Sequence, residues 1–384
     1  MEGASLASAI ANSVGTFMRH RLPGIACIAV LCGILTAGLW PFDAPGNQVA
    51  WIQDRNGLRF GGHGTVLSTA TLQASGSRDE PVCSVELWLE AALADNSGTI
   101  LAFHAPGNPL QFSLHQSLTD LKLQFRSAGP AERPKTKKIY VNDVFRRERS
   151  VFVTITSGAE ATFVYMNGAL ARTASGFRLT PRDCGGQLIV GDSPGQQDPW
   201  LGQVRGLAIY YSEIDAPAAL RHYNSWTREG KPEVGRNERI AALYLFDERG
   251  GNRVDNRARP GADLFIPTTY TVVDKVFLEP FWDEFDPSWS YWKNVLKNIA
   301  GFVPLGSCFC AYFALVRKSK RAGIVTVLVG AAASLTIEVL QGYLPTRDSG
   351  TTDLITNTFG TWIGVLLYNA LYNAAKARWN RRVL

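Results

Sequence analysis

Two carboxylates, an arginine and two side-chain amides lie close together near the C-terminal end of the chain, between two strongly apolar segments. Glu338 and Gln341 are three residues apart, and Asp353 and Asn357 are four residues apart, so each pair shares one face of a helix. Arg347 lies in the short connection between the two segments. If the two helices pack antiparallel, these groups converge at one end of the helix pair.

A carboxylate beside lipid is costly, so an ionisable residue in such a place is a functional hypothesis by default. One hypothesis, the alternative to a pure binding function, is a membrane enzyme or lipid handler that acts on a lipid-linked headgroup. Arg347 then holds a phosphate and a carboxylate serves as acid or base. The candidate catalytic residues are Glu338, Arg347 and Asp353. The candidate binding residues are Asn298, Gln341 and Asn357.

A structural interpretation of the same residues stays open. Glu338 and Arg347 form a purely structural ion pair in this alternative, because such pairs also perturb titration. Asn298 and Asn357 then form interhelical hydrogen bonds, each worth about 0.6 kcal/mol. The sequence contains no Ser–His or Cys–His arrangement and no cluster of metal ligands, and its five histidines lack ligand spacing. The sequence therefore does not indicate a reaction type. We favour a protein that is not an enzyme and that needs no cofactor.

Four apolar segments, each long enough to cross a bilayer, position these residues. They are residues 22–40, 295–316, 322–344 and 354–373. The first segment also resembles the apolar region of a signal peptide. We prefer a retained anchor, because the other end of the chain also lies in the membrane. Gly360 and Gly364 form a small-x-x-x-small pair that lets a neighbouring helix approach closely.

Basic residues predict the topology. The chain has 39 basic and 33 acidic residues, and the excess is concentrated beside the apolar segments, so it does not form a nucleic-acid-binding face. The positive-inside rule places the tail 1–21, the loop 317–321 and the C-terminus in the cytoplasm. The region between the first two spans then lies outside the cytoplasm. An aromatic segment, 281–292, is typical of the headgroup region of a bilayer.

Residues 45–270 have a different pattern, of short alternating strands separated by Gly, Asn and Asp. Strands at such spacing predict an antiparallel sandwich. Asn167-Gly168 fits a tight hairpin turn, and residues 216–226 form a helical stretch. The predicted strands are 82–90, 99–103, 121–125, 151–156, 162–165, 187–190 and 204–210.

This region resembles the concanavalin A-like, laminin-G-type jelly roll. The resemblance is carried by Glu86-Leu-Trp-Leu, by Val164-Tyr-Met-Asn-Gly, and by Leu188-Ile-Val-Gly followed by Pro199-Trp-Leu-Gly. It implies an all-β jelly-roll sandwich that binds sugar or protein, although the fold also supports catalysis. Relatives of the sandwich often bind Ca²⁺. We interpret the aspartates in Gly-rich turns as turn formers rather than calcium ligands; they are Asp192, Asp198 and Asp247.

The C-terminal part, residues 292–373, is similar to the VanZ-like family of bacterial membrane proteins. The motif is Asn298-x-x-Gly-Phe-x-Pro-Leu-Gly, then Glu338-x-x-Gln, and then Pro345-x-Arg followed by Asp353-x-x-x-Asn-x-x-Gly-x-x-x-Gly. The resemblance implies a multi-pass bacterial membrane protein, although this chain departs from the simple family form by carrying the sandwich between its first two spans. Together with the topology predicted from the basic residues, we expect an inner-membrane protein with both termini cytoplasmic and the jelly roll outside. The resemblance to this family does not indicate a biochemical activity. The implied partners are membrane lipid and a polysaccharide, peptidoglycan or an envelope protein, and no nucleic acid.

Two of the six cysteines, Cys83 and Cys184, lie in the predicted sandwich. If the sandwich lies outside the cytoplasm, a disulfide between them closes a loop of about a hundred residues and stabilises by about 4–5 kcal/mol. Two free buried thiols are the alternative.

Overall fold

The computed structural model describes residues 2–72, 82–105, 112–127, 135–145, 150–158, 160–195, 197–285 and 287–383. The chain divides into two compact units. Residues 1–43 and 276–384 form the first, here called the membrane unit, and residues 44–275 form the second, here called the jelly-roll unit.

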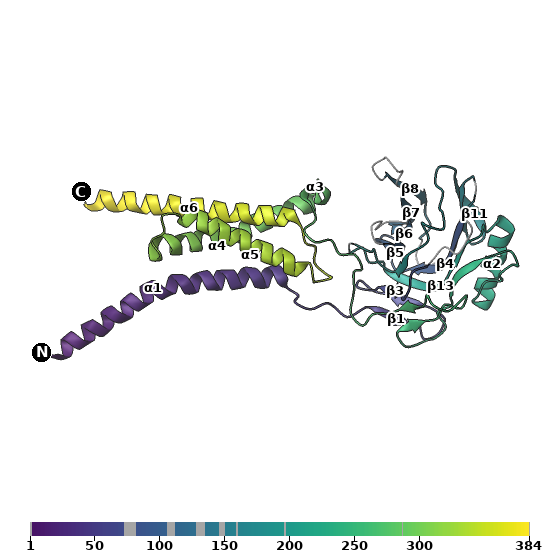
Figure 1. Ribbon diagram of the computed structural model, residues 1–384, viewed down its shortest axis with the longest axis horizontal. Helices are drawn as coiled ribbons and strands as arrows, with labels where there is room; N and C mark the ends of the chain where they lie inside the picture. The colour runs from purple at the N-terminus through teal and green to yellow at the C-terminus, as the bar shows by residue number, and fades with distance from the viewer. Residues whose placement is uncertain are drawn as a thin grey trace. The chain divides into compact units, whose positions relative to one another are not determined.

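The jelly-roll unit is a sandwich of two antiparallel sheets, as the sequence predicts (Figure 1). In the first sheet the strand order is β1-β2-β13-β4-β9-β10-β11, with β14 paired to β13. These strands are β1 (Val49–Trp51), β2 (Leu58–Phe60), β4 (Cys83–Ala91), β9 (Val151–Ser157), β10 (Thr162–Met166), β11 (Ala169–Ala174), β13 (Gly202–Tyr210) and β14 (Ile240–Tyr244).

The second sheet has the order β15-β16-β3-β12-β5-β6-β7-β8. Its strands are β3 (Val66–Ser68), β5 (Ser97–His104), β6 (Phe112–Ser117), β7 (Asp120–Ser127), β8 (Lys135–Val141), β12 (Gln187–Val190), β15 (Arg253–Val254) and β16 (Leu264–Phe265). The apolar core lies between the two sheets, and strand residues such as Leu87, Phe103 and Leu207 are fully buried in it.

Each of the seven predicted strands corresponds to a strand of the structure. The predicted turn is also present, because Asn167 and Gly168 between β10 and β11 both have positive φ, of 51° and 79°. The predicted strands do not include β6, the short strands β1, β2 and β3, or the strands β8 and β11. Lysines dominate the start of β8, and the edge strand β11 is exposed along most of its length, so neither has the alternating apolar pattern.

One helix, α2 (Ala216–Glu229), covers the outer face of the first sheet. Its N-cap Asp215 accepts a hydrogen bond from the Ala218 amide, and Gly230 ends the helix with φ of 72°. Trp226 of α2 packs against sheet residues that include Phe152 and Tyr210. Strand β4 is therefore buried on both faces.

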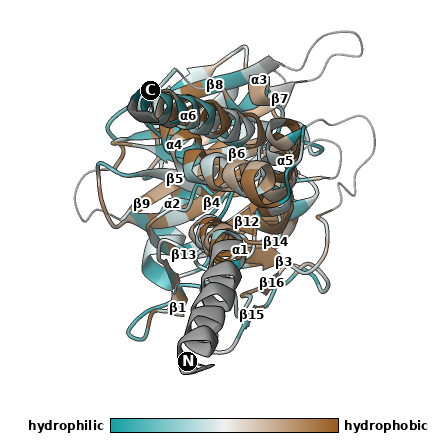
Figure 2. Cartoon of the chain, turned by 90° about the vertical axis from the view of Figure 1, so that its left-hand side faces the viewer, coloured by the Kyte–Doolittle hydropathy of each residue, from teal (hydrophilic) through white to brown (hydrophobic). Residues whose placement is uncertain are grey.

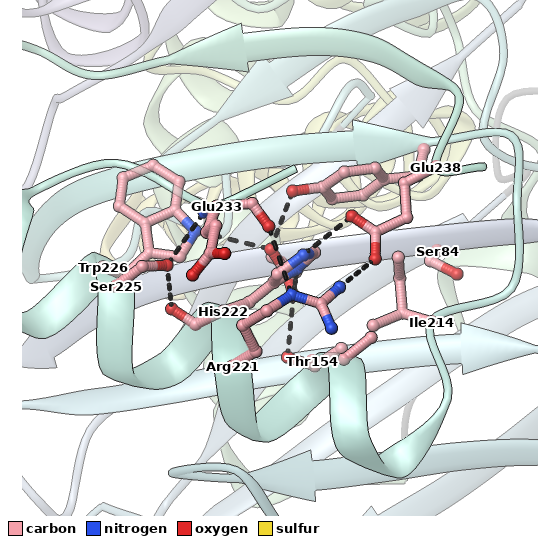
Figure 3. A network of polar contacts seen from close by, with 12 residues as sticks. Ser84, Thr154, Ile214, Arg221, His222, Ser225, Trp226, Glu233 and Glu238 are labelled. Atoms are coloured by element: carbon pink, nitrogen blue, oxygen red, sulfur yellow. Dashed lines mark hydrogen bonds and ion pairs between the residues drawn. The ribbon is translucent and has the colours of Figure 1, made fainter. Parts of the chain in front are cut away.

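A buried carboxylate, that of Glu86, holds α2 to the sheet, and Figure 3 labels its partners Thr154, His222 and Trp226. Glu86 on β4 is fully buried and accepts hydrogen bonds from Thr154 Oγ1 at 3.2 Å, Tyr210 OH at 3.0 Å and Trp226 Nε1 at 3.4 Å. His222 of α2 makes the fourth contact, with 2.9 Å between its Nδ1 and Glu86 Oε1. These partners satisfy the carboxylate from several strands and the helix.

His222 bridges two carboxylates. Its other ring nitrogen, Nε2, lies 2.9 Å from Glu238 Oε2, and Glu238 also pairs with Arg221. Burial alone lowers the pKa of His222, but the hydrogen bonds and charges of Glu86 and Glu238 outweigh burial and raise this pKa above its ordinary value of 6.5. The protonated imidazolium, with a donor on each nitrogen, suits both contacts.

Among its described residues, the membrane unit contains five helices. They are α1 (Glu2–Leu39), α3 (Phe281–Glu284), α4 (Trp289–Ala311), α5 (Ala322–Gln341) and α6 (Thr351–Val383), and a π-helical turn, Tyr312–Val316, extends α4. The predicted tail 1–21 is part of α1 from Glu2 onward. In Figure 2 the helices of this unit carry hydrophobic stretches in brown, and the C-terminal end of α6 is hydrophilic.

Among the described residues, three helical segments are long and apolar enough to cross a membrane. They are Arg21–Leu39, Trp289–Val316 and Ala322–Gln341. The predicted fourth span, 354–373, lies within α6, which is not among them because threonines and asparagines lower its hydropathy. Two of these polar residues, Asn357 and Thr361, are buried against neighbouring helices.

Glycines let α4 and α6 approach closely, as the small-x-x-x-small pair predicts. A Cβ atom on Gly360 would lie 2.2 Å from the carbonyl oxygen of Ile299, and one on Gly364 would lie 2.2 Å from that of Val303. The close approach brings the N-terminal parts of the two helices together. Any larger side chain at either position would push the helices apart.

Cys83 and Cys184 form a disulfide in the structure, with their Cα atoms 6.6 Å apart. The bond joins the start of β4 in the first sheet to the segment before β12 in the second. It therefore links the two layers of the sandwich.

Replacing both cysteines, Cys83→Ala with Cys184→Ala, is expected to destabilise the jelly-roll unit by about 4–5 kcal/mol, because the unfolded chain regains the entropy of a loop of about a hundred residues. Thermal unfolding followed by near-ultraviolet circular dichroism should give a Tm lower by about 10 °C or more. Cys32→Ala, at an exposed free cysteine, is the control. An unchanged Tm in the double variant would contradict the role of the disulfide.

The His222 contacts make stability depend on pH. Because the folded-state pKa is raised, this stabilisation is complete below about pH 6.5 and is lost as the pH rises through the folded-state pKa, at up to about 1.4 kcal/mol per pH unit. The gap in unfolding free energy between wild type and His222→Gln should therefore shrink as pH rises from 6 to 9 in denaturant titrations. His63→Gln, at a half-buried histidine, is the control. A gap that stays constant would contradict the protonated state of His222.

Candidate functional site

A cavity in the membrane unit brings together five of the six residues that the sequence singled out. Its volume is about 190 Å³, and it lies among α1, α4, α5 and α6. Its polar lining consists of Lys297, Asn298, Glu338, Gln341, Asp353 and Asn357. Its remaining lining consists of Ile34, Ala37, Gly38, Gly301, Phe302 and Ile337.

Glu338 is the most deeply buried of these polar residues, with 1% of its surface exposed. Its Oε2 accepts a hydrogen bond of 2.8 Å from the backbone N–H of Gly350, just before α6. A second carboxylate, Glu284 of α3, accepts a hydrogen bond of 2.8 Å from the Thr352 N–H. The first turn of a helix has N–H groups without partners inside the helix, so the start of α6 stabilises both carboxylates.

Asp353 and Asn298 are paired across α6 and α4. The Nδ2 of Asn298 donates a hydrogen bond of 2.6 Å to Asp353 Oδ1. The close packing at Gly360 and Gly364 makes this contact possible. Asn298 was predicted either to bind a ligand or to form an interhelical hydrogen bond. The structure contains the interhelical hydrogen bond, and the same side chain also lines the cavity.

Asn357 is only partly satisfied. Its Nδ2 donates a hydrogen bond of 3.0 Å to Ser334 Oγ on α5. Only 5% of the residue is exposed. Its Oδ1 is buried and has no hydrogen-bond partner in the described part of the chain. A buried acceptor without a partner is unfavourable. Asn357 therefore offers an unused acceptor in a side chain that lines the cavity.

Arg347 does not line the cavity. It donates a hydrogen bond to the backbone carbonyl of Trp40, after the end of α1. Gln341 Nε2 donates in the same way to the Gly38 carbonyl, at 2.8 Å. The last carbonyls of a helix lack partners inside it, so these two side chains hold the C-terminal end of α1. The alternative in which Glu338 and Arg347 form an ion pair is wrong, since no ion pair joins them among the described residues.

The lining can bind a ligand through hydrogen bonds. Carboxylates accept from hydroxyl or ammonium groups, side-chain amides both donate and accept, and Lys297 supplies a donor. None of the lining residues is a histidine, cysteine or serine. Among the described residues, no group of three His, Cys, Asp or Glu is placed to hold a metal ion.

The three aspartates considered for Ca²⁺ have other partners. Asp192 accepts hydrogen bonds from Tyr270 OH and from the backbone N–H groups of Ser193 and Asp198. Burial raises the pKa of Asp192 above its ordinary value. Asp198 accepts a hydrogen bond of 2.6 Å from Thr99 Oγ1. The third, Asp247, pairs with an arginine.

Comparison with known families also gives two parts, with a boundary that differs from that of the structure. Residues 60–218 match the family model of the concanavalin A-like lectin/glucanases superfamily. Residues 249–372 match the VanZ/LLP1 family model. The second match begins inside the jelly-roll unit, where β15 and β16 pair with the sandwich. The structural boundary, at residue 276, therefore lies later than the start of the family match.

Solved structures with similarity to this chain have low sequence identity to it. A protein from Bacteroides ovatus, proposed to bind carbohydrate, is 12% identical with a TM-score of 0.40, and the match covers 57% of this chain and 61% of that one. The heptameric SAP-like pentraxin from Limulus polyphemus is 13% identical with a TM-score of 0.34, over 60% and 94%. The receptor binding domain of botulinum neurotoxin D is 14% identical with a TM-score of 0.38, over 55% and 60%.

A search of the curated proteins finds no match. The family models, the two-sheet sandwich and the apolar helices indicate the same two kinds of domain in this chain. It is a membrane protein that combines a concanavalin A-like jelly-roll domain with a VanZ-like domain.

Proposed function

We propose that this chain is a cell-envelope protein whose membrane unit binds the saccharide headgroup of a lipid in the cavity lined by Glu338 and Asp353. The observation that carries the proposal is the convergence of these two carboxylates with three amides on one cavity. Carboxylates and amides together match the dense hydroxyl groups of a sugar. The apolar side chains of the lining would face the less polar parts of the ligand.

Binding, and not catalysis, is the function that this geometry favours. The catalytic hypothesis needs Arg347 to hold a phosphate, and Arg347 is engaged at the end of α1 instead. Lys297 is the cation that lines the cavity, beside two carboxylates. With two carboxylates and one lysine, the lining suits a neutral headgroup rich in hydroxyl groups better than a phosphate.

We further infer four membrane spans, with α6 as the fourth. The cavity lies near the C-terminal ends of α1 and α5 and near the N-terminal ends of α4 and α6. The basic loop 317–321 and the basic C-terminal residues follow the opposite ends of α4 and α6. The positive-inside rule places those basic ends in the cytoplasm, so the cavity faces the outer leaflet.

The jelly-roll unit would then lie outside the cytoplasm, in a bacterial envelope, where a disulfide persists. Its resemblance to lectins supports a role in binding glycan, such as envelope polysaccharide or peptidoglycan, and an envelope protein is the other partner class. Exposed aromatic side chains at Phe281, Trp282 and Trp289 suit the membrane interface.

Binding of a lipid-linked sugar tests the proposal. Full-length protein in nanodiscs should bind monoglucosyldiacylglycerol more tightly than diacylglycerol in native mass spectrometry. Glu338→Gln and Asp353→Asn should each weaken binding about tenfold or more, because each removes a charged hydrogen-bond acceptor worth about 1.5–3 kcal/mol. Glu338→Gln keeps an oxygen for the Gly350 N–H, so the fold should persist.

Asp348→Asn is the matched control, because this carboxylate is exposed and does not line the cavity. It should bind as wild type does. Equal binding of both lipids, or unchanged binding by both cavity variants, would overturn the proposal.

A further inference from the structure

A second cavity, of about 280 Å³, lies in the jelly-roll unit and shares no lining residue with the membrane cavity. It is formed where three parts of the sandwich meet: the segment after β3, strand β14 and the loop between β15 and β16. Its lining residues are Ala70, Thr71, Leu72, Ala241, Asn256 and the segment 259–262. None of these residues is acidic.

Asn256 has a fixed orientation in this cavity. Its side-chain Oδ1 accepts hydrogen bonds of 3.0 Å from the backbone N–H groups of both Leu243 and Ala258. Two backbone donors on one atom identify that atom as the oxygen, so the amide cannot be reversed without losing both bonds. The Nδ2 group is therefore the part that is free to act as a donor.

That donor has no partner. Asn256 is 7% exposed, and its Nδ2 is buried without a hydrogen-bond partner among the described residues. A buried donor that is left unsatisfied costs free energy, and such groups in folded proteins call for a ligand, a water or a structural reason. Here the unsatisfied donor belongs to a residue that lines an open cavity.

Arg259 provides a cation at the same cavity. Its Nε donates a hydrogen bond of 3.2 Å to the Ala241 carbonyl, which fixes one edge of the guanidinium. No ion pair joins it to a carboxylate in the described part of the chain. The neighbouring Asp263 is already engaged, because it accepts from the Asn256 backbone N–H and from Arg253. The charge of Arg259 is therefore available to a ligand.

We propose that the Asn256 and Arg259 side chains form a binding site for a saccharide residue that carries a carboxylate. Arg259 binds the carboxylate through charge-assisted hydrogen bonds, and the Asn256 amide donates to a carboxylate or hydroxyl oxygen. The apolar walls, such as Leu72 and Pro260, pack against the C–H face of the ring. A cavity of about 280 Å³ is below the usual range for drug-sized ligands, so it accepts one sugar unit rather than an oligomer.

This inference rests on the proposed glycan-binding role of the jelly-roll unit and specifies its ligand class. It is independent of the membrane cavity, since the two sites share no residue. Variants of one site should therefore leave the other site unchanged, which separates the failure of one proposal from the failure of the other.

Galacturonic acid and galactose are the probes, because they differ in the carboxylate at one carbon. Isothermal titration of full-length protein in nanodiscs should detect galacturonic acid and give at least tenfold weaker binding of galactose. Asn256→Asp keeps an oxygen for both backbone donors but replaces the free N–H group by a negative charge. It should abolish binding of galacturonic acid, and Arg259→Gln should weaken it at least tenfold.

Arg172→Gln, at an exposed arginine on β11, is the matched control and should bind galacturonic acid as wild type does. Glu338→Gln should also leave this binding unchanged. Acetate tests the sugar ring and should bind at least tenfold more weakly than galacturonic acid. Absence of galacturonic acid binding, equal binding of galactose or acetate, or normal binding by Arg259→Gln would overturn the proposal.

Discussion

The membrane unit depends on one constraint: backbone groups at helix ends lack partners inside the helix and must find them elsewhere. Gln341 and Arg347 donate to carbonyls at the end of α1, and Glu338 and Glu284 accept from N–H groups at the start of α6. These contacts tie α1, α5, α6 and α3 together at one end. Glu338, Gln341 and Gly38 take part in these contacts and also line the cavity, so the site is a consequence of how the helices are held.

Buried polar groups with hydrogen-bond partners stabilise the fold of this chain, whereas buried polar groups without partners indicate candidate ligand sites. Glu86 in the jelly-roll unit is fully buried, but its oxygens are surrounded by donors from β9, β13 and α2, so the network serves the fold. Asn357 and Asn256 each use one end of their amide for the fold, and the other end has no hydrogen-bond partner among the residues that the structure describes. Each of them lines a cavity, which is why we assign ligands to these places.

Much of the architecture could be predicted from local patterns. Alternating strands, the Asn167-Gly168 turn and the long apolar runs depend on neighbours in sequence, and the structure contains them. The cluster around Glu338 was also predictable, because helical spacing places its members on common faces. The position of Arg347 was not, since its partner, the Trp40 carbonyl, is 307 residues away. The environment of Glu86 was missed for the same reason, because its partners Thr154, Tyr210 and His222 are 68 to 136 residues away.

The central claim is that the cavity among α1, α4, α5 and α6 holds the headgroup of a lipid-linked sugar. The most direct measurement is a cryo-electron microscopy map of the full-length protein in nanodiscs that contain monoglucosyldiacylglycerol. Our account predicts headgroup density within hydrogen-bond distance of Glu338, Asp353 and Asn357, and no such density in nanodiscs that lack the sugar lipid. A well-resolved map in which the cavity is empty or closed, with the sugar lipid ordered elsewhere, would contradict it.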